Sequence, residues 1–256
     1  MKSLEECVVN AMDGTDQRLF PFLPYLLQDV WEIGADPIAI SHLFKKHCQN
    51  TSQASVLDLG CGKGAISVQL SRDWGCRCHG IDAIPEFIRC AREKAIEWDV
   101  DQKCYFVTGD IRHIVNQLPP YDVVILGAIG PVFGDLYTTL ETLSHCIRKN
   151  GIFILDDGYI EDDSDFEHPM MYKKSLLLQQ IENAGMQLLE SVVMDKELIR
   201  VSNEYIFKHI RIRGLELIEK FPDQKNLILD YLKIQETEND VLENKVIGTT
   251  MVIGRK

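Results

Sequence analysis

The sequence predicts an α/β domain in which helices cover both faces of a mostly parallel sheet. From about residue 55 to residue 156, short apolar runs alternate with amphipathic stretches. Nearly continuous apolar strands joined by helices are typical of a parallel sheet that is buried on both sides. A chain of 256 residues fits one such domain with a modest insertion.

The central part of the chain contains five expected strands with helices between them. The strands are expected at Ser55–Leu59, Cys78–Ile81, Cys104–Thr108, Asp122–Leu126 and Gly151–Leu155. The helices are expected at Ala65–Asp73, Pro85–Trp98, Ile111–Gln117 and Gly134–Arg148. Apolar residues recur at spacings of three and four after Pro85, which indicates a helical stripe, and Pro85 itself suits a first helical turn.

The two flanks are predicted to be mostly helical. Residues 1–50 are expected to form two or three helices, broken at Pro21, Pro24 and Pro37, that act as a substrate cap. Residues 51–256 are expected to form the main domain. Its later elements are a helix ended by Gly185 as a left-handed cap, two more strands, and a helical pair between those strands. Their predicted ranges are Tyr172–Ala184, Met186–Met194, Val246–Ile253 and about 203–240.

The charge balance argues against nucleic acid as a partner. The net charge is −12, from 39 acidic and 27 basic residues, and such a surface repels phosphate backbones. One basic cluster, formed by Lys208, His209, Arg211 and Arg213, is interpreted as a solvated helix face.

The distribution of apolar residues predicts a cytoplasmic protein with no membrane partner. Apolar runs such as Val123–Ile129 are far shorter than the roughly 20 residues that a membrane span needs. The first six residues carry no secretory signal pattern. The eight cysteines lack disulfide-dense or zinc-finger spacing, so we expect reduced thiols and no metal site.

The most informative segment is a glycine-rich loop that follows the first strand. Asp58 is followed by glycines at positions 60, 62 and 64, which open a helix. Glycine is needed where the backbone takes positive φ or where a ligand lies against it. Amides at the start of the helix favour a carboxylate, and Asp58 provides the opposite charge for an ammonium. The loop therefore suits a ligand that is an amino acid.

The next two strands also end in acidic residues. Asp82 follows the second strand and can accept hydrogen bonds from a ribose diol, at what we expect to be an exposed strand end. Asp110 follows the third strand and could accept from an adenine amino group, with Ile111 against the ring. Amino acid, ribose and adenine together describe S-adenosyl-L-methionine.

On these motifs the chain resembles the class I S-adenosylmethionine-dependent methyltransferases, in particular the small-molecule branch. The resemblance implies a Rossmann-like seven-stranded sheet with N-terminal helices and a helical insertion before the last strand. It also implies methyl transfer to a small molecule. By the same resemblance, the cofactor-binding positions are Asp58, Gly60, Cys61, Gly62, Gly64, Asp82, Ala83, Asp110, Ile111 and Gly127.

Two other interpretations stay open at this point. The loop also satisfies the dinucleotide-binding fingerprint, with Asp82 at the spacing of a ribose acid. Asp58 places negative charge where a pyrophosphate would lie, which disfavours an NAD(P)-dependent oxidoreductase. A non-catalytic protein that binds S-adenosylmethionine or S-adenosylhomocysteine is not separated from an enzyme by any sequence feature.

The sequence says much less about the residues that bind the methyl acceptor, and no catalytic residue is assigned. The segment Leu126–Phe133 lacks the N/D-P-P-Y/F motif, which argues against DNA adenine or glutamine methylation, and Asp156-Asp157 is interpreted as a turn. Candidates for proton handling are Asp157, Tyr159, His168 and His113; candidates for substrate contact are Tyr25, Trp31, Tyr159 and His168. The 203–240 insertion is expected to be a lid or, alternatively, a homodimer interface.

Overall fold

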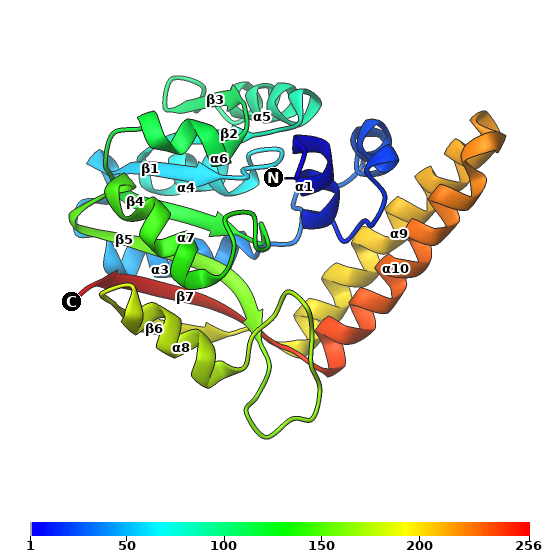
Figure 1. Ribbon diagram of the computed structural model, residues 1–256. Helices are drawn as coiled ribbons and strands as arrows, with labels where there is room; N and C mark the ends of the chain where they lie inside the picture. Colours follow the sequence, from blue (N-terminus) through cyan, green and yellow to red (C-terminus); the bar gives the residue numbers. More distant parts are fainter. Residues whose placement is uncertain (1) are drawn as a thin grey trace.

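A seven-stranded sheet forms the centre of the computed structural model, which describes residues 2–256 (Figure 1). Its order is β3-β2-β1-β4-β5-β7-β6. The first five strands pair in parallel, and β7 lies antiparallel between β5 and β6. The strands are β1 Ser55–Leu59, β2 Arg77–Asp82, β3 Cys104–Thr108, β4 Tyr121–Gly127, β5 Ile147–Tyr159, β6 Met186–Val193 and β7 Ile247–Arg255.

Both faces of this sheet are buried, as the sequence predicts. Alternate residues of β4 point to opposite sides, so Val123 packs in one apolar cluster and Val124 in the other. One face is covered by α3 (Pro37–His47) and α4 (Ala65–Trp74), and the other by α6 (Ile111–Ile114), α7 (Leu136–Leu143) and α8 (Lys174–Asn183). A further helix, α5 (Pro85–Glu97), packs against β2 and β3.

The N-terminal residues divide between two places. Helix α1 (Leu4–Ala11), a 3-10 helix (Gln17–Phe22) and α2 (Leu23–Leu26) lie beside the sheet, whereas α3 packs onto its face. The expected helices are therefore present, but the last of them belongs to the main core. The boundary falls near Asp36, whose side chain caps the first turn of α3.

The predicted insertion is a long helical hairpin that projects from the body (Figure 1). Helix α9 (Lys196–Lys220), a 3-10 turn (Pro222–Gln224) and α10 (Lys225–Asn244) extend beyond the expected 203–240 range at both ends. Asp195 starts α9 immediately after β6 by accepting hydrogen bonds from two backbone amides of the first turn. Toward its turn, the hairpin shares an apolar cluster with the N-terminal segment, including Leu23 and Leu217.

Strand β5 differs most from the expectation. It begins at Ile147 and continues through Asp156 and Asp157 to Tyr159, so the interpretation of the two acidic residues as a turn was wrong. The strand continues because β7 pairs antiparallel with it as far as Tyr159 and Ile247. The expected Gly134–Arg148 helix is accordingly shorter.

Three general expectations concern membranes, thiols and metals. Within residues 2–256, no helix is both long enough and apolar enough to cross a membrane. All eight cysteines are unpaired. The described residues contain no group of three or more His, Cys, Asp or Glu side chains arranged to hold a metal ion.

Candidate functional site

The glycine loop between β1 and α4 has an unusual backbone. Gly60, Gly62 and Gly64 have φ values of +69°, +52° and +74°, which favour glycine. The amides of Gly60 and Cys61 donate to the carbonyl of Ile81, at 2.8 and 3.0 Å, and thereby join the loop to the end of β2.

Two of the three glycines are also required by close packing. A side chain at Gly60 would meet Ile129 Cγ2 at 2.5 Å, and one at Gly64 would meet Ala91 and Phe106 at 2.8 Å. Gly62 is the least crowded, since the nearest atom to an added Cβ would be Ile33 Cδ1 at 3.8 Å. Gly62 is therefore where a ligand has the closest access to the loop backbone.

Asp58 is a fully buried carboxylate at the end of β1. Ser67 Oγ donates to Asp58 Oδ2 at 2.7 Å, whereas Oδ1 is buried and has no hydrogen-bond partner within residues 2–256. Burial raises the pKa of Asp58 to about 6, and the nearby charge of Asp82 adds to the rise. Because buried acceptors are nearly always paired, this oxygen calls for a donor, preferably a cation.

Asp82 lies at the end of β2, next to the same loop. The backbone amide of Gly62 donates to Oδ2 and that of Ile84 donates to Oδ1, both at 2.9 Å. The expected exposed position was wrong, because the residue is only 8% exposed. Burial raises the pKa of Asp82 to about 6, against the opposing effect of the two amides. Each oxygen keeps a further lone pair for a hydroxyl donor.

Asp110, after β3, is engaged by a neighbour that the sequence did not single out. Its side chain caps α6 and forms a 2.7 Å ion pair with Arg112, which holds the pKa of Asp110 below its usual value. Arg112 also donates to the carbonyl of Lys2 and to Cys7 Sγ, so the pair connects β3 to α1. Ile111 is buried next to it.

Lys63, inside the glycine loop, is a functional-looking residue that the sequence analysis missed. Its ammonium is buried and donates to the carbonyls of Leu27 and Val30, while Trp31 Nε1 donates to the Lys63 carbonyl at 2.9 Å. Burial lowers the pKa of Lys63. These bonds hold the N-terminal segment over the loop. No local pattern marks them, because the partners lie more than 30 positions earlier in the chain.

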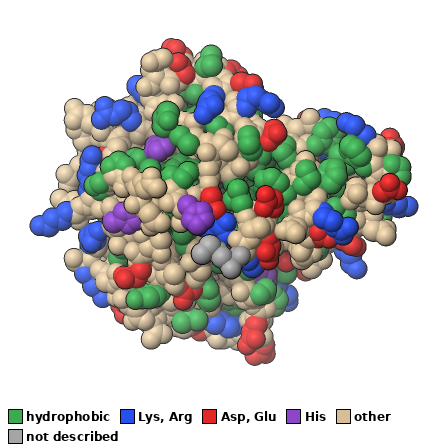
Figure 2. All heavy atoms as spheres, turned by 45° about the horizontal axis from the view of Figure 1, so that its top comes forward, with side chains coloured by type: hydrophobic (Ala, Val, Ile, Leu, Met, Phe, Trp, Pro, Cys, Tyr) green, Lys and Arg blue, Asp and Glu red, His purple; other side chains and the backbone are tan. Residues whose placement is uncertain are grey.

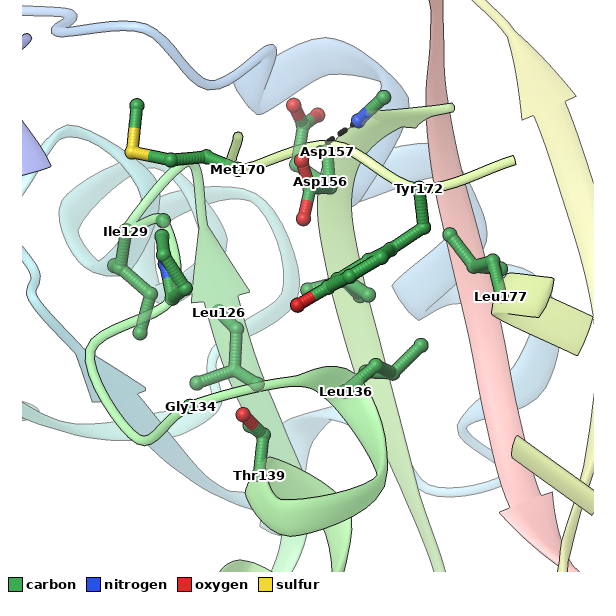
Figure 3. A pocket seen from close by; sticks show the side chains of 14 residues that line it. Leu126, Ile129, Gly134, Leu136, Thr139, Asp156, Asp157, Met170, Tyr172 and Leu177 are labelled. Atoms are coloured by element: carbon green, nitrogen blue, oxygen red, sulfur yellow. Dashed lines mark hydrogen bonds between the residues drawn. The ribbon is translucent and has the colours of Figure 1, made fainter. Parts of the chain in front are cut away.

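A small cavity lies beyond the ends of β4 and β5 (Figure 3). It encloses about 40 Å³. Its wall is mainly apolar, and Thr139, Asp157 and Tyr172 supply polar side chains. Gly127, at the end of β4, is nearby in sequence and packs against Ile66 and Ala35. Asp156 also belongs to the lining; Thr250 Oγ1 donates to its carboxylate at 2.9 Å, and burial raises its pKa to about 7.

The proposed acceptor contacts are not gathered around this cavity. Tyr25 donates to Glu216 at 2.8 Å, and Trp31 packs against Trp98 at a ring distance of 5.0 Å. Tyr159 is buried, and the ammonium of Lys174 lies over its ring. His168 Nε2 lies 3.4 Å from Glu238, and His113 is mostly exposed. Of the proton-handling candidates, Asp157 alone lines the cavity.

Comparison with known sequences gives a consistent pattern. A family model described as a methyltransferase domain matches residues 50–214. The chain is similar to a sterol 24-C-methyltransferase of Debaryomyces hansenii, with 25% identity over 178 residues, which are 61% of this chain and 46% of that protein. The chain thus spans about half or less of the length of the curated relatives that it matches first.

Solved structures show the same fold at low sequence identity. A SAM-dependent methyltransferase from Thiobacillus denitrificans, solved with S-adenosyl-L-homocysteine, superposes with a TM-score of 0.75 and 16% identity over 92% of this chain and 98% of that one. The cyclopropane synthase MmaA2 from Mycobacterium tuberculosis gives 0.75 and 12% identity over 100% of this chain and 99% of that one. At these identities the likeness concerns the fold.

Proposed function

This chain belongs to the methyltransferase-domain family, and we propose that it transfers a methyl group from S-adenosylmethionine to a small-molecule acceptor. The observation that carries the proposal is Asp58 Oδ1, a buried carboxylate oxygen without a donor beside a glycine loop. An ammonium group there would satisfy the oxygen and favour its charged form. The cofactor is an amino acid at one end, so it would supply that ammonium.

The remaining strand ends fit the other parts of the same cofactor. Asp82 would accept from the ribose hydroxyls, since both oxygens are fixed by backbone amides and retain free lone pairs. Asp110 and Ile111 would lie at the adenine, with Arg112 holding the Asp110 carboxylate in place. The other positions proposed for cofactor contact are Cys61, Ala83 and Gly127, together with the three loop glycines.

On the acceptor side, positioning is expected to supply most of the rate. The bound cofactor provides an electrophilic methyl group on a sulfonium. The chain would align the acceptor by enclosing it in apolar walls and by excluding water. Among the polar side chains of the cavity, Asp157 carries a carboxylate that could accept a proton from the acceptor. Because the cavity encloses only about 40 Å³, a bound acceptor would need the segment after β4 to shift.

A small-molecule acceptor is supported by what the relatives are named for. They include a sterol methyltransferase from Debaryomyces hansenii, and the names of other relatives refer to methyltransferases of other small molecules. The net charge of −12 supports neither nucleic acid nor an anionic membrane as a partner. The eight unpaired thiols support a cytoplasmic location, which cell fractionation would test.

Calorimetry tests the cofactor assignment. We expect the purified protein to bind S-adenosylmethionine and S-adenosylhomocysteine, and not NAD at comparable concentration. Asp82→Asn should weaken binding about 10- to 150-fold, which corresponds to about 1.5–3 kcal/mol for one charge-assisted hydrogen bond. Because Asp82 is buried, thermal unfolding of the variant must be measured beside its affinity.

The matched control is Asp101→Asn, an exposed aspartate at the far end of the neighbouring strands. It should leave affinity unchanged. Tight NAD binding without binding of the sulfonium compound would contradict the proposal. Binding without turnover of any acceptor in a screen of small alcohols, amines and acids would instead favour a non-catalytic binding protein.

A further inference from the structure

Helix α9 carries a second apolar face that no part of residues 2–256 covers. Its inner face, which includes Ile210 and Leu217, packs against α10 and the N-terminal segment. Large apolar side chains on the opposite face are between 43% and 64% exposed; they are Leu198, Val201, Tyr205, Ile212 and Leu215. Figure 2 shows hydrophobic side chains beside charged ones on the lobe at the right that the hairpin forms. Exposed apolar side chains that gather on one face of a helix often mark an interface.

The spacing of this face is that of a coiled-coil seam. From Leu198 to Leu215 the exposed apolar residues follow one another at intervals of three, four, seven and three positions. Leu198, Tyr205 and Ile212 therefore occupy the first place of a seven-residue repeat. Val201 and Leu215 occupy the fourth place, and the remaining fourth place is filled by Lys208. The helix has 25 residues, or a length of about 37 Å, which is enough for three such repeats.

We propose that α9 packs antiparallel against α9 of a second copy of this chain, around a two-fold axis near Ile206 and Phe207. In antiparallel seams the first places of one helix face the fourth places of the other. Leu198 then meets Leu215 of the partner subunit, and Val201 meets Ile212 of the partner subunit. Tyr205 meets Lys208 of the partner subunit, whose ammonium can contact the Tyr205 ring and hydroxyl oxygen. A two-fold axis forms each of these contacts twice.

The charges beside the seam agree with this arrangement. Glu204 and Arg211 both occupy the flanking place just before a first-place residue, and in an antiparallel pair such places face each other. Glu204 therefore meets Arg211 of the partner subunit, twice. Within its own helix Glu204 pairs with Arg200 at the surface, where an exchange of partners costs little. A parallel pair would instead place Lys208 against Lys208 of the partner subunit, which disfavours it.

Sedimentation of the full chain with charge-exchange variants tests the proposal. The unmodified protein should sediment as a dimer of the 29.2 kDa chain at micromolar concentration. Glu204→Arg alone and Arg211→Glu alone should each weaken association at least tenfold, because each creates two like-charged contacts. The double variant should restore it, because both contacts then reverse their signs. Val201→Glu should give a monomer.

The control is Glu236→Arg, a charge reversal at an exposed position of α10, which should leave the dimer unchanged. Circular dichroism of each variant should show retained helix. A protein that is monomeric at about 100 μM would overturn the proposal, as would a double variant no better than the singles. Binding of the monomer to phosphatidylcholine vesicles that is lost in Val201→Glu would assign the face to a lipid surface and equally contradict it.

Discussion

The burial of Asp58 makes its ionised form unfavourable in the free protein, and a cationic ligand can offset this cost. A pKa of about 6 in place of 3.8 means that ionising this buried carboxyl costs about 3 kcal/mol more than in water. In the free protein the neutral carboxyl is favoured below that pKa. Its contribution to the stability of the folded state is therefore present at low pH and is lost as the pH rises through about 6. A ligand that brings an ammonium to Oδ1 recovers part of the cost.

The affinity for S-adenosylhomocysteine should therefore depend on pH. Below about pH 6 the free protein holds a proton on Asp58 that the ammonium must displace, so affinity should fall by about tenfold per pH unit. Calorimetry between pH 5 and pH 8 measures this slope. The variant Asp58→Asn should bind weakly with a flatter profile. An unmodified protein with constant affinity across the range would show that the ligand does not contact Asp58.

At the scale of elements, the strands and most helices were predictable because their patterns are local. The run Ser55–Leu59 is bounded by turn residues, and β1 has those same limits. The end of β5 was not predictable, since it depends on pairing with β7 almost 90 residues later. The same holds for the site. Asp58 and Asp82 stand in a recognisable motif, whereas the burial of Asp82 and the bonds of Lys63 arise from tertiary contacts.

The contact between the glycine loop and the N-terminal segment should depend on Lys63. Replacing it in Lys63→Met removes the ammonium from the carbonyls of Leu27 and Val30. Local opening of residues 23–36 should become easier by about 1–3 kcal/mol, and affinity for S-adenosylhomocysteine should fall. Hydrogen exchange measures the opening directly. Lys149→Met, at an exposed position, is the control. Unchanged exchange in residues 23–36 would mean that the apolar cluster alone holds the segment.

At the scale of the whole molecule, the glycine loop and the hairpin both meet the N-terminal segment. The glycine loop contacts it through Lys63, and the hairpin contacts it through residues of α9. Arg213 forms a 2.6 Å ion pair with Asp29, and Tyr25 donates to Glu216 at 2.8 Å. The hairpin contributes no residue to the cavity wall. The N-terminal segment is therefore one route by which the hairpin can influence the site, and β7, which continues from the hairpin and pairs with β5, is another.

This connection predicts that cofactor binding slows hydrogen exchange in the hairpin as well as in the loop. S-adenosylhomocysteine should order the loop, and the ordered segment between Tyr25 and Asp29 should then protect the facing part of α9. Exchange of free and bound protein provides the measurement. In Lys63→Met the protection of α9 should disappear while that of the loop remains. Protection of the loop alone in the unmodified protein would indicate that the hairpin is independent of the site.

The central place of β7 also has a consequence for synthesis of the protein. β7 lies between β5 and β6, yet it is translated after both and after a hairpin of two long helices. At about 5–20 residues per second, the ribosome needs roughly 2–10 s to make that hairpin. During this time β5 pairs with β4 on one side and has an open edge on the other, and β6 has no neighbour in the sheet. The nascent chain therefore exposes a strand edge with unpaired backbone groups, which is prone to aggregation and is the kind of surface that chaperones cover.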